Sequence, residues 1–245
     1  MNRRIIIGDI HGNYKGVEKL LSSAKYLPSK DILIFVGDFN DHLELPGFST
    51  RKTIELLLSL KEQSDKVFFV LGNHDLWFRE WFETGGIPNP IWIKQGARET
   101  FKSYNIHKLR EAESQLDKIP NTHKDFYIND LQDYYLDDVM VVVHGGFTNP
   151  GQMAAISKRE KLEYEQLYQI IWDRRFIFTK LQEEKTLFKK YFDDRYLVVG
   201  HTPYGPYQSD INQKWVLVDG GSKMGKAQLG VVISNSSCHF ITEND

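Results

Sequence analysis

The feature of this chain that most constrains its fold is a series of six short apolar runs, each closed by a glycine. The runs are rich in β-branched residues and do not alternate with polar residues. Strands buried on both faces of a sheet have this composition, because their side chains meet apolar surroundings on either side. The runs are "III" at 5–7, "ILIFVGD" at 32–38, "VFFVLGN" at 67–73, "VMVVVHG" at 139–145, "YLVVGH" at 196–201 and "WVLVDGG" at 215–221.

Helical patterns separate the first three runs, with apolar stripes formed by Val17, Leu20, Leu21 and Ala24 and by Ile54, Leu57 and Leu58. The order strand, helix, strand, helix, strand predicts parallel βαβ units and an α/β fold. The stretch from about 76 to 137 is richer in polar and aromatic residues and is expected to form a mainly helical insertion or cap. With no linker in view and 41% apolar residues, we expect one domain over residues 1–245.

Charge and cysteine content limit which binding partners and which cell compartment we expect for this protein. The formal net charge of −2 supplies no basic field for nucleic acid, and nucleic acid is therefore not expected as a partner. Cys238 is the only cysteine, so an intrachain disulfide is excluded and a reducing compartment is expected. The first apolar run is too short for a secretory signal, and no stretch approaches the roughly 20 apolar residues of a membrane helix. We expect a cytoplasmic protein without membrane contact.

Chemically reactive side chains follow five of the apolar runs, at the point where each predicted strand ends. Ligands in open α/β sheets bind beyond the carboxyl ends of the strands, so these side chains are expected to meet in one place. Each of them alone is compatible with an ordinary loop or turn, but their repeated placement indicates a shared metal site. They are Asp9, His11, Asp38, Asn73, His74, His144 and His201.

The types of ligand atom limit which metal ions the site is expected to bind. Asp9 and His11 are two residues apart in extended backbone, so their side chains leave on the same side and can converge on one ion. Apart from His74, the candidates offer three imidazoles, two carboxylates and one amide, without a thiolate. This donor set suits manganese, iron or zinc better than calcium. Six ligands are too many for one catalytic ion that also holds water. They fit two divalent ions about 3.5–4 Å apart, bridged by a shared carboxylate and by hydroxide, with manganese as the preferred metal.

Five segments resemble, in order and spacing, the motif set of the calcineurin-like metallophosphoesterases. More narrowly, the set is similar to the phosphoprotein phosphatase branch, which includes bacterial and phage serine/threonine phosphatases and symmetrical diadenosine tetraphosphate hydrolases. The resemblance spans roughly residues 5–222, and "WIKQGARETFKSY", "IIWDRRF" and "LVDGGS" agree with secondary features of the branch. It implies two packed mixed β-sheets flanked by helices, an α/β/β/α sandwich. The five segments are "GDIHGN" at 8–13, "GDFND" at 37–41, "GNHD" at 72–75, "VHGG" at 143–146 and "GHTP" at 200–203.

The resemblance also implies metal ligands, residue by residue. Asp9 and His11 would bind the first ion, and Asp38 would bridge both ions. The second ion would be completed by Asn73, His144 and His201.

Catalytic roles follow from the same resemblance. Hydroxide between the ions would attack phosphorus directly, and His74 would protonate the departing oxygen. Asp41 would orient the His74 imidazole and keep it charged. Arg174 matches the phosphate-binding arginine of the branch, with Arg175 as a neighbouring alternative and an ordinary surface arginine as a further one.

One position departs from the family pattern. The branch usually reads Gly-Asp-x-Val-Asp-Arg-Gly, whereas this chain reads "GDFNDHL", so that His42 stands in the place of the arginine. His42 could bind phosphate as a cation only when it is protonated. The alternative is that His42 is an ordinary loop residue.

Three functions remain open from the sequence. The first is a metal-dependent phosphomonoesterase acting on phosphoserine or phosphothreonine in proteins and on small phosphate esters. The second is a hydrolase of dinucleoside polyphosphates such as diadenosine tetraphosphate, which would need a pocket for two bases. The third is a phosphate-binding module without turnover. The complete set of predicted ligands, together with the proposed acid His74, favours an enzyme.

Overall fold

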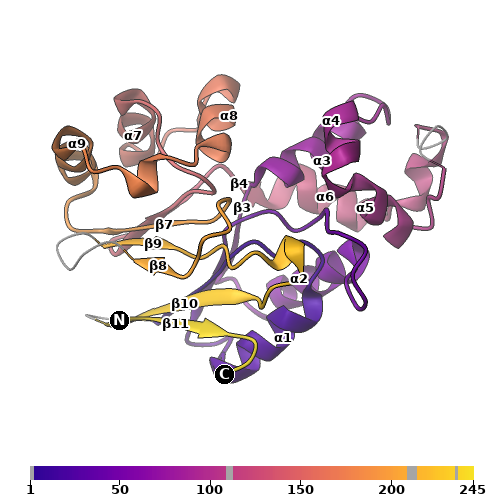
Figure 1. Ribbon diagram of the computed structural model, residues 1–245, viewed down its shortest axis with the longest axis horizontal. Coiled ribbons are helices and arrows are strands. Elements are labelled where there is room, and N and C mark those ends of the chain that lie inside the picture. Colours follow the sequence, from indigo (N-terminus) through magenta and orange to yellow (C-terminus); the bar gives the residue numbers. More distant parts are fainter. Residues whose placement is uncertain (1–2, 109–112, 209–213, 235–236) are drawn as a thin grey trace.

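The computed structural model describes residues 3–108, 113–208, 214–234 and 237–245. Two β-sheets lie face to face, and helices cover the outer face of each (Figure 1). The layers are therefore helix, sheet, sheet and helix. This confirms the predicted α/β fold of two packed, mixed sheets flanked by helices.

The first sheet has the strand order β11-β10-β1-β2-β3-β4. Strands β1 to β4 run parallel to one another, while β10 is antiparallel to both β1 and β11. The strands of this sheet are β1 (Arg4–Ile7), β2 (Ile32–Phe35), β3 (Val67–Val70), β4 (Leu131–Gln132), β10 (Leu229–Ser234) and β11 (Ser237–Thr242).

The second sheet has the order β5-β6-β7-β9-β8. Its three central strands are parallel, and the two edge strands β5 and β8 are antiparallel to their neighbours. The strands are β5 (Tyr135–Leu136), β6 (Met140–Val142), β7 (Tyr196–Val199), β8 (Tyr207–Gln208) and β9 (Trp215–Leu217). All six apolar runs of the sequence are thus strands, three in each sheet.

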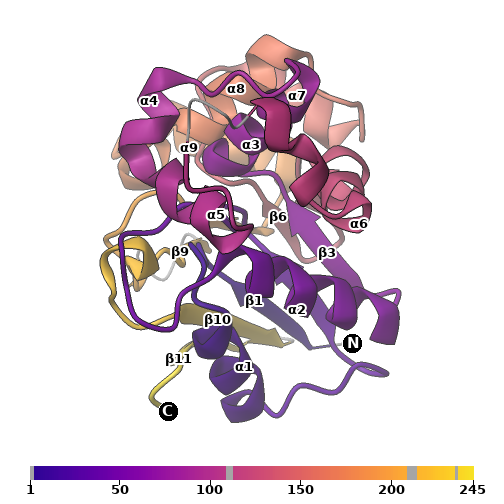
Figure 2. The same cartoon turned by 90° about the vertical axis from the view of Figure 1, so that its right-hand side faces the viewer.

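Helices occupy three regions around the sheets. Helices α1 and α2 cover the first sheet, α7 to α9 cover the second, and α3 to α6 lie beside the sheets (Figures 1 and 2). Their bounds are α1 (Tyr14–Ser23), α2 (Thr50–Gln63), α3 (Asn73–Glu83), α4 (Pro90–Trp92), α5 (Arg98–Ser103), α6 (Asn121–Asp125), α7 (Pro150–Ser157), α8 (Tyr164–Trp172) and α9 (Gln182–Phe192). Shorter helical turns are η1 (Ile93–Ala97), η3 (Glu113–Lys118), η4 (Phe126–Asp130), η5 (Phe176–Phe178) and η6 (Ser222–Met224).

The core explains why the strand sequences do not alternate between apolar and polar residues. In β1, Ile5 and Ile7 pack against the helices on the outer face, while Ile6 packs between the two sheets. In β7, Leu197 faces the outer helices and Val198 faces the first sheet. Both faces of these strands are therefore covered, and apart from Arg4 at the start of β1 their positions are apolar.

None of the helices in the described part of the chain combines the length and the apolar character that are needed to cross a lipid bilayer.

Candidate metal centre

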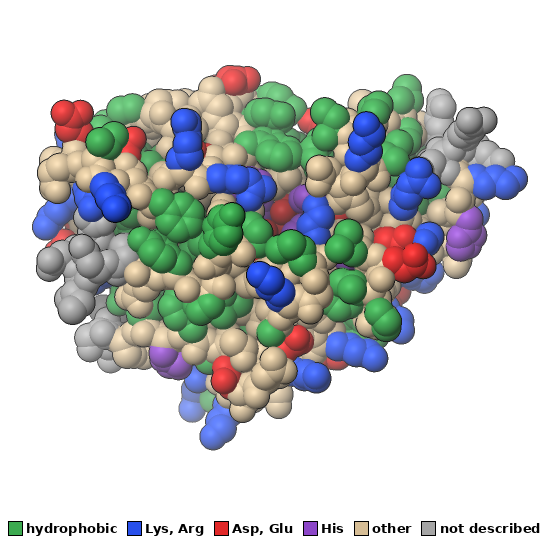
Figure 3. Space-filling view, viewed as in Figure 1, with side chains coloured by type: hydrophobic (Ala, Val, Ile, Leu, Met, Phe, Trp, Pro, Cys, Tyr) green, Lys and Arg blue, Asp and Glu red, His purple; other side chains and the backbone are tan. Residues whose placement is uncertain are grey.

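The predicted metal ligands follow the carboxyl ends of five parallel strands. Strands β1, β2 and β3 of the first sheet and β6 and β7 of the second deliver them to one region of the molecule. Figure 3 shows aspartate or glutamate and histidine side chains at the bottom of a hollow in the middle of one face, with lysine or arginine side chains beside it. The ligands themselves are almost fully buried: Asp9, His11, Asp38, Asn73, His144 and His201.

Two groups of three side chains have the spacing of metal ligands. Asp9, His11 and Asp38 place one donor atom each within 4.8 Å of one another, and so do Asp38, His144 and His201. Asp38 belongs to both groups, as a bridging carboxylate would. The structure thus brings together five of the six predicted ligands as two adjoining triads.

The sixth predicted ligand joins the second triad. The Asn73 amide oxygen lies 3.1 Å from Nε2 of His144, and the same nitrogen lies 3.4 Å from Oδ2 of Asp38. On the other side of the shared carboxylate, Nε2 of His11 lies 3.6 Å from Oδ2 of Asp38. The side chain of Asp38 therefore stands between the imidazoles of the two groups.

Backbone carbonyls orient two of the imidazoles. Nδ1 of His11 lies 2.8 Å from the carbonyl oxygens of Asn40 and Asp41, and Nδ1 of His144 lies 2.8 Å from that of Val36. A carbonyl accepts only from a protonated Nδ1, so the neutral ring presents the lone pair of Nε2 to the cluster. Such partners are typical of metal-binding histidines.

His201 supplies the clearest sign that the cluster fits a cation. Its side chain is only 3% exposed, and Nε2 has no hydrogen-bond partner among the described residues. A buried polar nitrogen without a partner is costly, and a metal ion would satisfy it. The donor set fits two divalent ions.

Burial sets the protonation of two of the imidazoles, and neighbouring charges set that of Asp38 and His144. It lowers the pKa of His11 to about 3 and that of His201 to about 2, so both rings are neutral near pH 7. Burial would raise the pKa of Asp38, but the nearby His144 and His74 lower it well below its ordinary value. A neutral imidazole and an ionised carboxylate are the forms that bind metal, and His11, His201 and Asp38 favour these forms. Burial would lower the pKa of His144, but the Asp38 and Asp9 carboxylates raise it to about 10, so a proton must leave His144 when an ion binds.

The backbone at the site is strained. Four non-glycine site residues have φ in the left-handed region: His11 at 46°, Asp38 at 55°, Asp41 at 64° and His201 at 65°. Such conformations cost free energy and persist where the surrounding structure holds them in place, often at functional sites. Gly72 matters for a different reason, because a Cβ there would overlap the Asp38 carboxylate.

Asp75, which the sequence analysis did not single out, accepts hydrogen bonds from the loop after β2 that contains Asp38, called the Asp38 loop below. Its Oδ2 accepts the N–H of Asp38 at 2.7 Å and that of Gly72 at 2.9 Å, and its Oδ1 accepts the N–H of Phe39 at 2.9 Å. Burial and the neighbouring Asp38 raise the pKa of Asp75 to about 7. The last letter of "GNHD" was the available signal for this residue.

The ring of His74 packs edge-on against that of His11, with 5.1 Å between the ring centroids. Its Nδ1 lies 2.7 Å from Oδ2 of Asp41, while the adjacent Asn73 faces His144, so the two neighbouring side chains diverge. Asp41 also accepts hydrogen bonds from Nε1 of Trp92 and, at 2.5 Å, from the hydroxyl of Thr100. The predicted acid and its carboxylate thus form a buried pair beside the metal centre.

The three predicted phosphate-binding candidates differ in position. Arg174 donates from Nη1 to the carbonyl oxygen of His201 at 2.5 Å, which places its guanidinium at the site. The Arg175 side chain is 90% exposed and lies 3.9 Å from the Asp173 carboxylate. The geometry therefore favours Arg174 over Arg175.

His42 lies in a different environment. It is buried, and its Nδ1 faces the carbonyl of Leu43 at 2.5 Å. The ring packs 5.7 Å from that of Phe48, and burial lowers the pKa of His42, which favours the uncharged imidazole. These contacts fit the loop-residue alternative better than a role as a phosphate-binding cation.

A lysine that the sequence analysis did not consider reaches the site instead. Nζ of Lys223, in turn η6, lies 3.0 Å from Nε2 of His74. This nitrogen is on the opposite side of the ring from Asp41. Lys223 directly follows the "LVDGGS" segment but is not part of it, so no motif marked the lysine itself.

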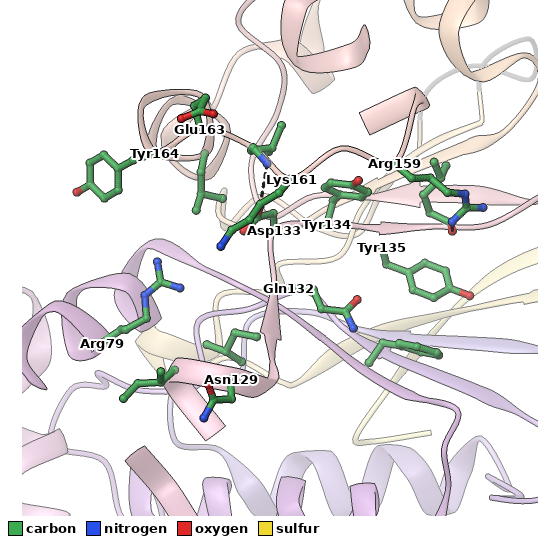
Figure 4. A pocket seen from close by; sticks show the side chains of 16 residues that line it. Arg79, Asn129, Gln132, Asp133, Tyr134, Tyr135, Arg159, Lys161, Glu163 and Tyr164 are labelled. Atoms are coloured by element: carbon green, nitrogen blue, oxygen red, sulfur yellow. Dashed lines mark hydrogen bonds between the residues drawn. The ribbon is translucent and has the colours of Figure 1, made fainter. Parts of the chain in front are cut away.

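A cavity of about 1110 Å³ lies elsewhere, where β4 and β5 meet helices α3 and α8 (Figure 4). Arg79, Arg159 and Lys161 are among its polar lining residues, together with Asp133 and Glu163. None of the six predicted metal ligands is among the described residues that line it. The cavity is therefore separate from the metal centre.

Relatives share a short stretch of sequence with this chain. One of them is the symmetrical bis(5'-nucleosyl)-tetraphosphatase of Xylella fastidiosa strain 9a5c, which is 39% identical to this chain over 70 residues. The matched stretch is 29% of this chain and 22% of that protein. The match thus spans less than a quarter of the relative's length.

Solved structures are similar over the whole chain. The cold-active protein-tyrosine phosphatase of a Shewanella species has a TM-score of 0.68 at 18% identity, covering 100% of this chain and 78% of that one. A protein serine/threonine phosphatase from Saccharomyces cerevisiae has a TM-score of 0.62 at 15% identity, covering 98% and 79%. At these identities the likeness concerns the fold. The family model described as calcineurin-like phosphoesterase matches residues 3–224. Since that match takes in most of the sequence, the chain belongs to the calcineurin-like phosphoesterase family.

Proposed function

We propose that this chain is a phosphomonoesterase that requires two divalent metal ions and hydrolyses phosphoserine and phosphothreonine in proteins. The observation that carries the proposal is the pair of ligand triads sharing Asp38, next to a buried His74–Asp41 pair. An ion site with an acid–base histidine beside it combines the parts that hydrolysis of a phosphate ester needs.

The residues divide the work of the reaction. When bound, two divalent ions supply an activated water as nucleophile and neutralise charge on the phosphoryl group. His74 holds a proton for the departing alkoxide, and Asp41 fixes the orientation of the ring through Nδ1. Arg174 offers a guanidinium that can bind a phosphoryl oxygen.

Manganese is the proposed metal. The donor set of imidazole, carboxylate and amide oxygen contains no thiolate, and such sites suit manganese, with iron and zinc fitting the same donors.

A second candidate is hydrolysis of dinucleoside polyphosphates, because the locally similar relative is named a symmetrical bis(5'-nucleosyl)-tetraphosphatase. That reaction needs surfaces on which two bases can stack. The large aromatic side chains Trp81, Trp92 and Phe101 of the segment between β3 and β4 are buried in the core instead. These three side chains therefore offer no surface to a base, whereas Tyr204, three residues after His201, is 75% exposed.

The test compares kcat/KM for a phosphoserine peptide and for diadenosine tetraphosphate, using the manganese-loaded full chain. The proposal expects the higher value for the phosphopeptide, and a higher value for the dinucleotide would favour the second candidate. A chain that binds manganese, iron, zinc or cobalt but hydrolyses neither substrate would be a phosphate-binding module without turnover.

A further inference from the structure

Lys223 occupies a distinctive place beside the proposed acid. Its Nζ lies 3.0 Å from Nε2 of His74, the nitrogen that does not face Asp41, and 3.5 Å from the side-chain oxygen of Gln95. The lysine comes from turn η6 after β9, and Gln95 comes from the helical segment between β3 and β4. The ammonium group therefore lies where two distant parts of the chain meet His74.

The turn that carries Lys223 is held against the loop after β1, which contains Asp9 and His11. The hydroxyl of Ser222 donates to the carbonyl of Ile10 at 2.8 Å, and the N–H of Gly221 donates to Oδ1 of Asp219 at 2.8 Å. Gly221 and Gly225 flank the turn with φ of 87° and 76°, a conformation that glycine adopts at little cost. The direction of the lysine is thus set by the backbone around it.

Lys223 lacks an anionic partner at short range. Within the described ranges, no carboxylate forms an ion pair with it, and its hydrogen-bond partners are an imidazole nitrogen and an amide oxygen. Burial lowers its pKa, while the Asp41 and Asp38 carboxylates oppose that effect. A cation that is partly removed from water is costly unless an anion pairs with it, so this position suits an anionic ligand.

We infer that Lys223 binds a non-bridging oxygen of the substrate's phosphoryl group. The inference rests on the proposed function, which brings a phosphoryl group to the space between the metal ligands and His74. A lysine ammonium is a compact charge that suits a phosphoryl oxygen. His42 is a weaker candidate for this role: its Nε2 has no hydrogen-bond partner among the described residues, but burial lowers the pKa of the ring and so disfavours the cation.

The test replaces Lys223 by Met, which keeps the length of the side chain and removes its charge, and by Arg, which keeps a cation. Lys226→Met is the matched control, since Lys226 is an exposed lysine three residues further along. The manganese-loaded full chain is titrated with inorganic phosphate by calorimetry, and kcat and KM are measured on p-nitrophenyl phosphate. Circular dichroism melting verifies that each variant is folded.

Lys223→Met is expected to raise both the phosphate dissociation constant and KM about 10- to 100-fold, the range for a lost hydrogen bond to a charged group. Lys223→Arg should restore most of the affinity, and Lys226→Met should match the wild type. If Lys223 acted only by adjusting His74, kcat would fall while phosphate affinity stayed unchanged, and that result would overturn the inference.

The failure of the proposed function is a separate outcome. Wild-type protein without turnover would contradict the phosphomonoesterase, and the phosphate titration would still test the lysine. Equal phosphate affinity of wild type and Lys223→Met, or no phosphate binding by either, would overturn the role of Lys223.

Discussion

Oδ2 of Asp41 lies 2.7 Å from Nδ1 of His74, in a position that is fixed from a later part of the chain. Thr100, in α5, donates to the other carboxylate oxygen at 2.5 Å and accepts the N–H of Asp41 at 2.9 Å. Trp92, in α4, donates to the same oxygen as His74. The helical segment between β3 and β4 thus positions the proposed acid.

Replacing Asp41 by Asn is expected to lower kcat on an alkyl phosphate by about 10²–10³-fold, because the ring would lose the charge that orients it. Steady-state kinetics of the manganese-loaded protein measure the effect. Asp117→Asn, at an exposed position in the same helical segment, is the control and should behave as wild type. A kcat for Asp41→Asn within twofold of wild type would contradict the role of Asp41.

Arg174 and Arg175 form a natural matched pair. Arg174→Met is expected to raise KM for p-nitrophenyl phosphate about 10-fold, because its guanidinium lies at the carbonyl of His201 beside the site. Arg175→Met should leave KM unchanged, because its side chain is directed to solvent. The reverse pattern would assign phosphate binding to Arg175.

Asp75→Asn is expected to weaken manganese binding about 10- to 100-fold. The amide can accept with only one of its two end atoms, so at least one of the backbone N–H groups of Asp38, Phe39 and Gly72 would lose its partner. Calorimetric titration of metal-free protein measures the affinity, with Glu83→Gln at the exposed end of α3 as the control. Unchanged affinity would show that the Asp38 loop does not depend on Asp75.

A prediction about stability concerns Arg4 and Asp137, which tie β1 of the first sheet to the β5–β6 connection of the second. Nε of Arg4 lies 2.6 Å from Oδ2 of Asp137, and the side chains are 7% and 18% exposed. Asp137→Asn is expected to cost about 1.5–3 kcal/mol, because it removes the charge of the more buried of the two carboxylates that pair with the Arg4 guanidinium. Asp138 pairs with the same guanidinium, with its Oδ1 3.1 Å from Nη2 of Arg4, but its side chain is 70% exposed, so Asp138→Asn should cost less than about 0.5 kcal/mol.

The difference in stability between the wild type and Asp137→Asn should depend on pH. Burial would raise the pKa of Asp137, but hydrogen bonds from Val139 and Arg4 lower it below its ordinary value of 3.8. The ionised carboxylate therefore stabilises the fold above that value, and the contribution is lost as pH falls through the folded-state pKa. Thermal melting of the wild type and of Asp137→Asn from pH 7 to pH 2 should show that the difference between their melting temperatures becomes smaller in acid. A difference of constant size would contradict this assignment.

The convergence of the candidate metal ligands could be predicted because strand ends carry a strong local signal. An apolar run followed by glycine and then by Asp9 or Asp38, or followed directly by His144 and glycine, shows both where the strand stops and which side chain leaves it. Parallel strands bring those ends together, so the convergence follows from the topology alone. The same logic did not locate β10 or set its antiparallel pairing with β1, since that pairing joins opposite ends of the chain.

The supporting residues were harder to predict. Asp75 acts on backbone N–H groups of a loop some 36 residues away, and this contact exists only once the turn has formed. Lys223 reaches His74 through a glycine-flanked turn whose direction no local pattern in the sequence indicates. His42 stands at a motif position, yet the loop turns its ring toward Leu43 and Phe48.

The most direct measurement compares wild type with His74→Asn after metal removal and manganese addition, on p-nitrophenyl phosphate and on an alkyl phosphate. We predict that turnover appears only with manganese. His74→Asn should lower turnover of the alkyl ester by about 10²–10⁴-fold and that of the nitrophenyl ester by less, because nitrophenolate leaves easily without a proton. The account would be contradicted if metal-loaded wild type hydrolysed neither ester, or if His74→Asn hydrolysed the alkyl ester as fast as wild type.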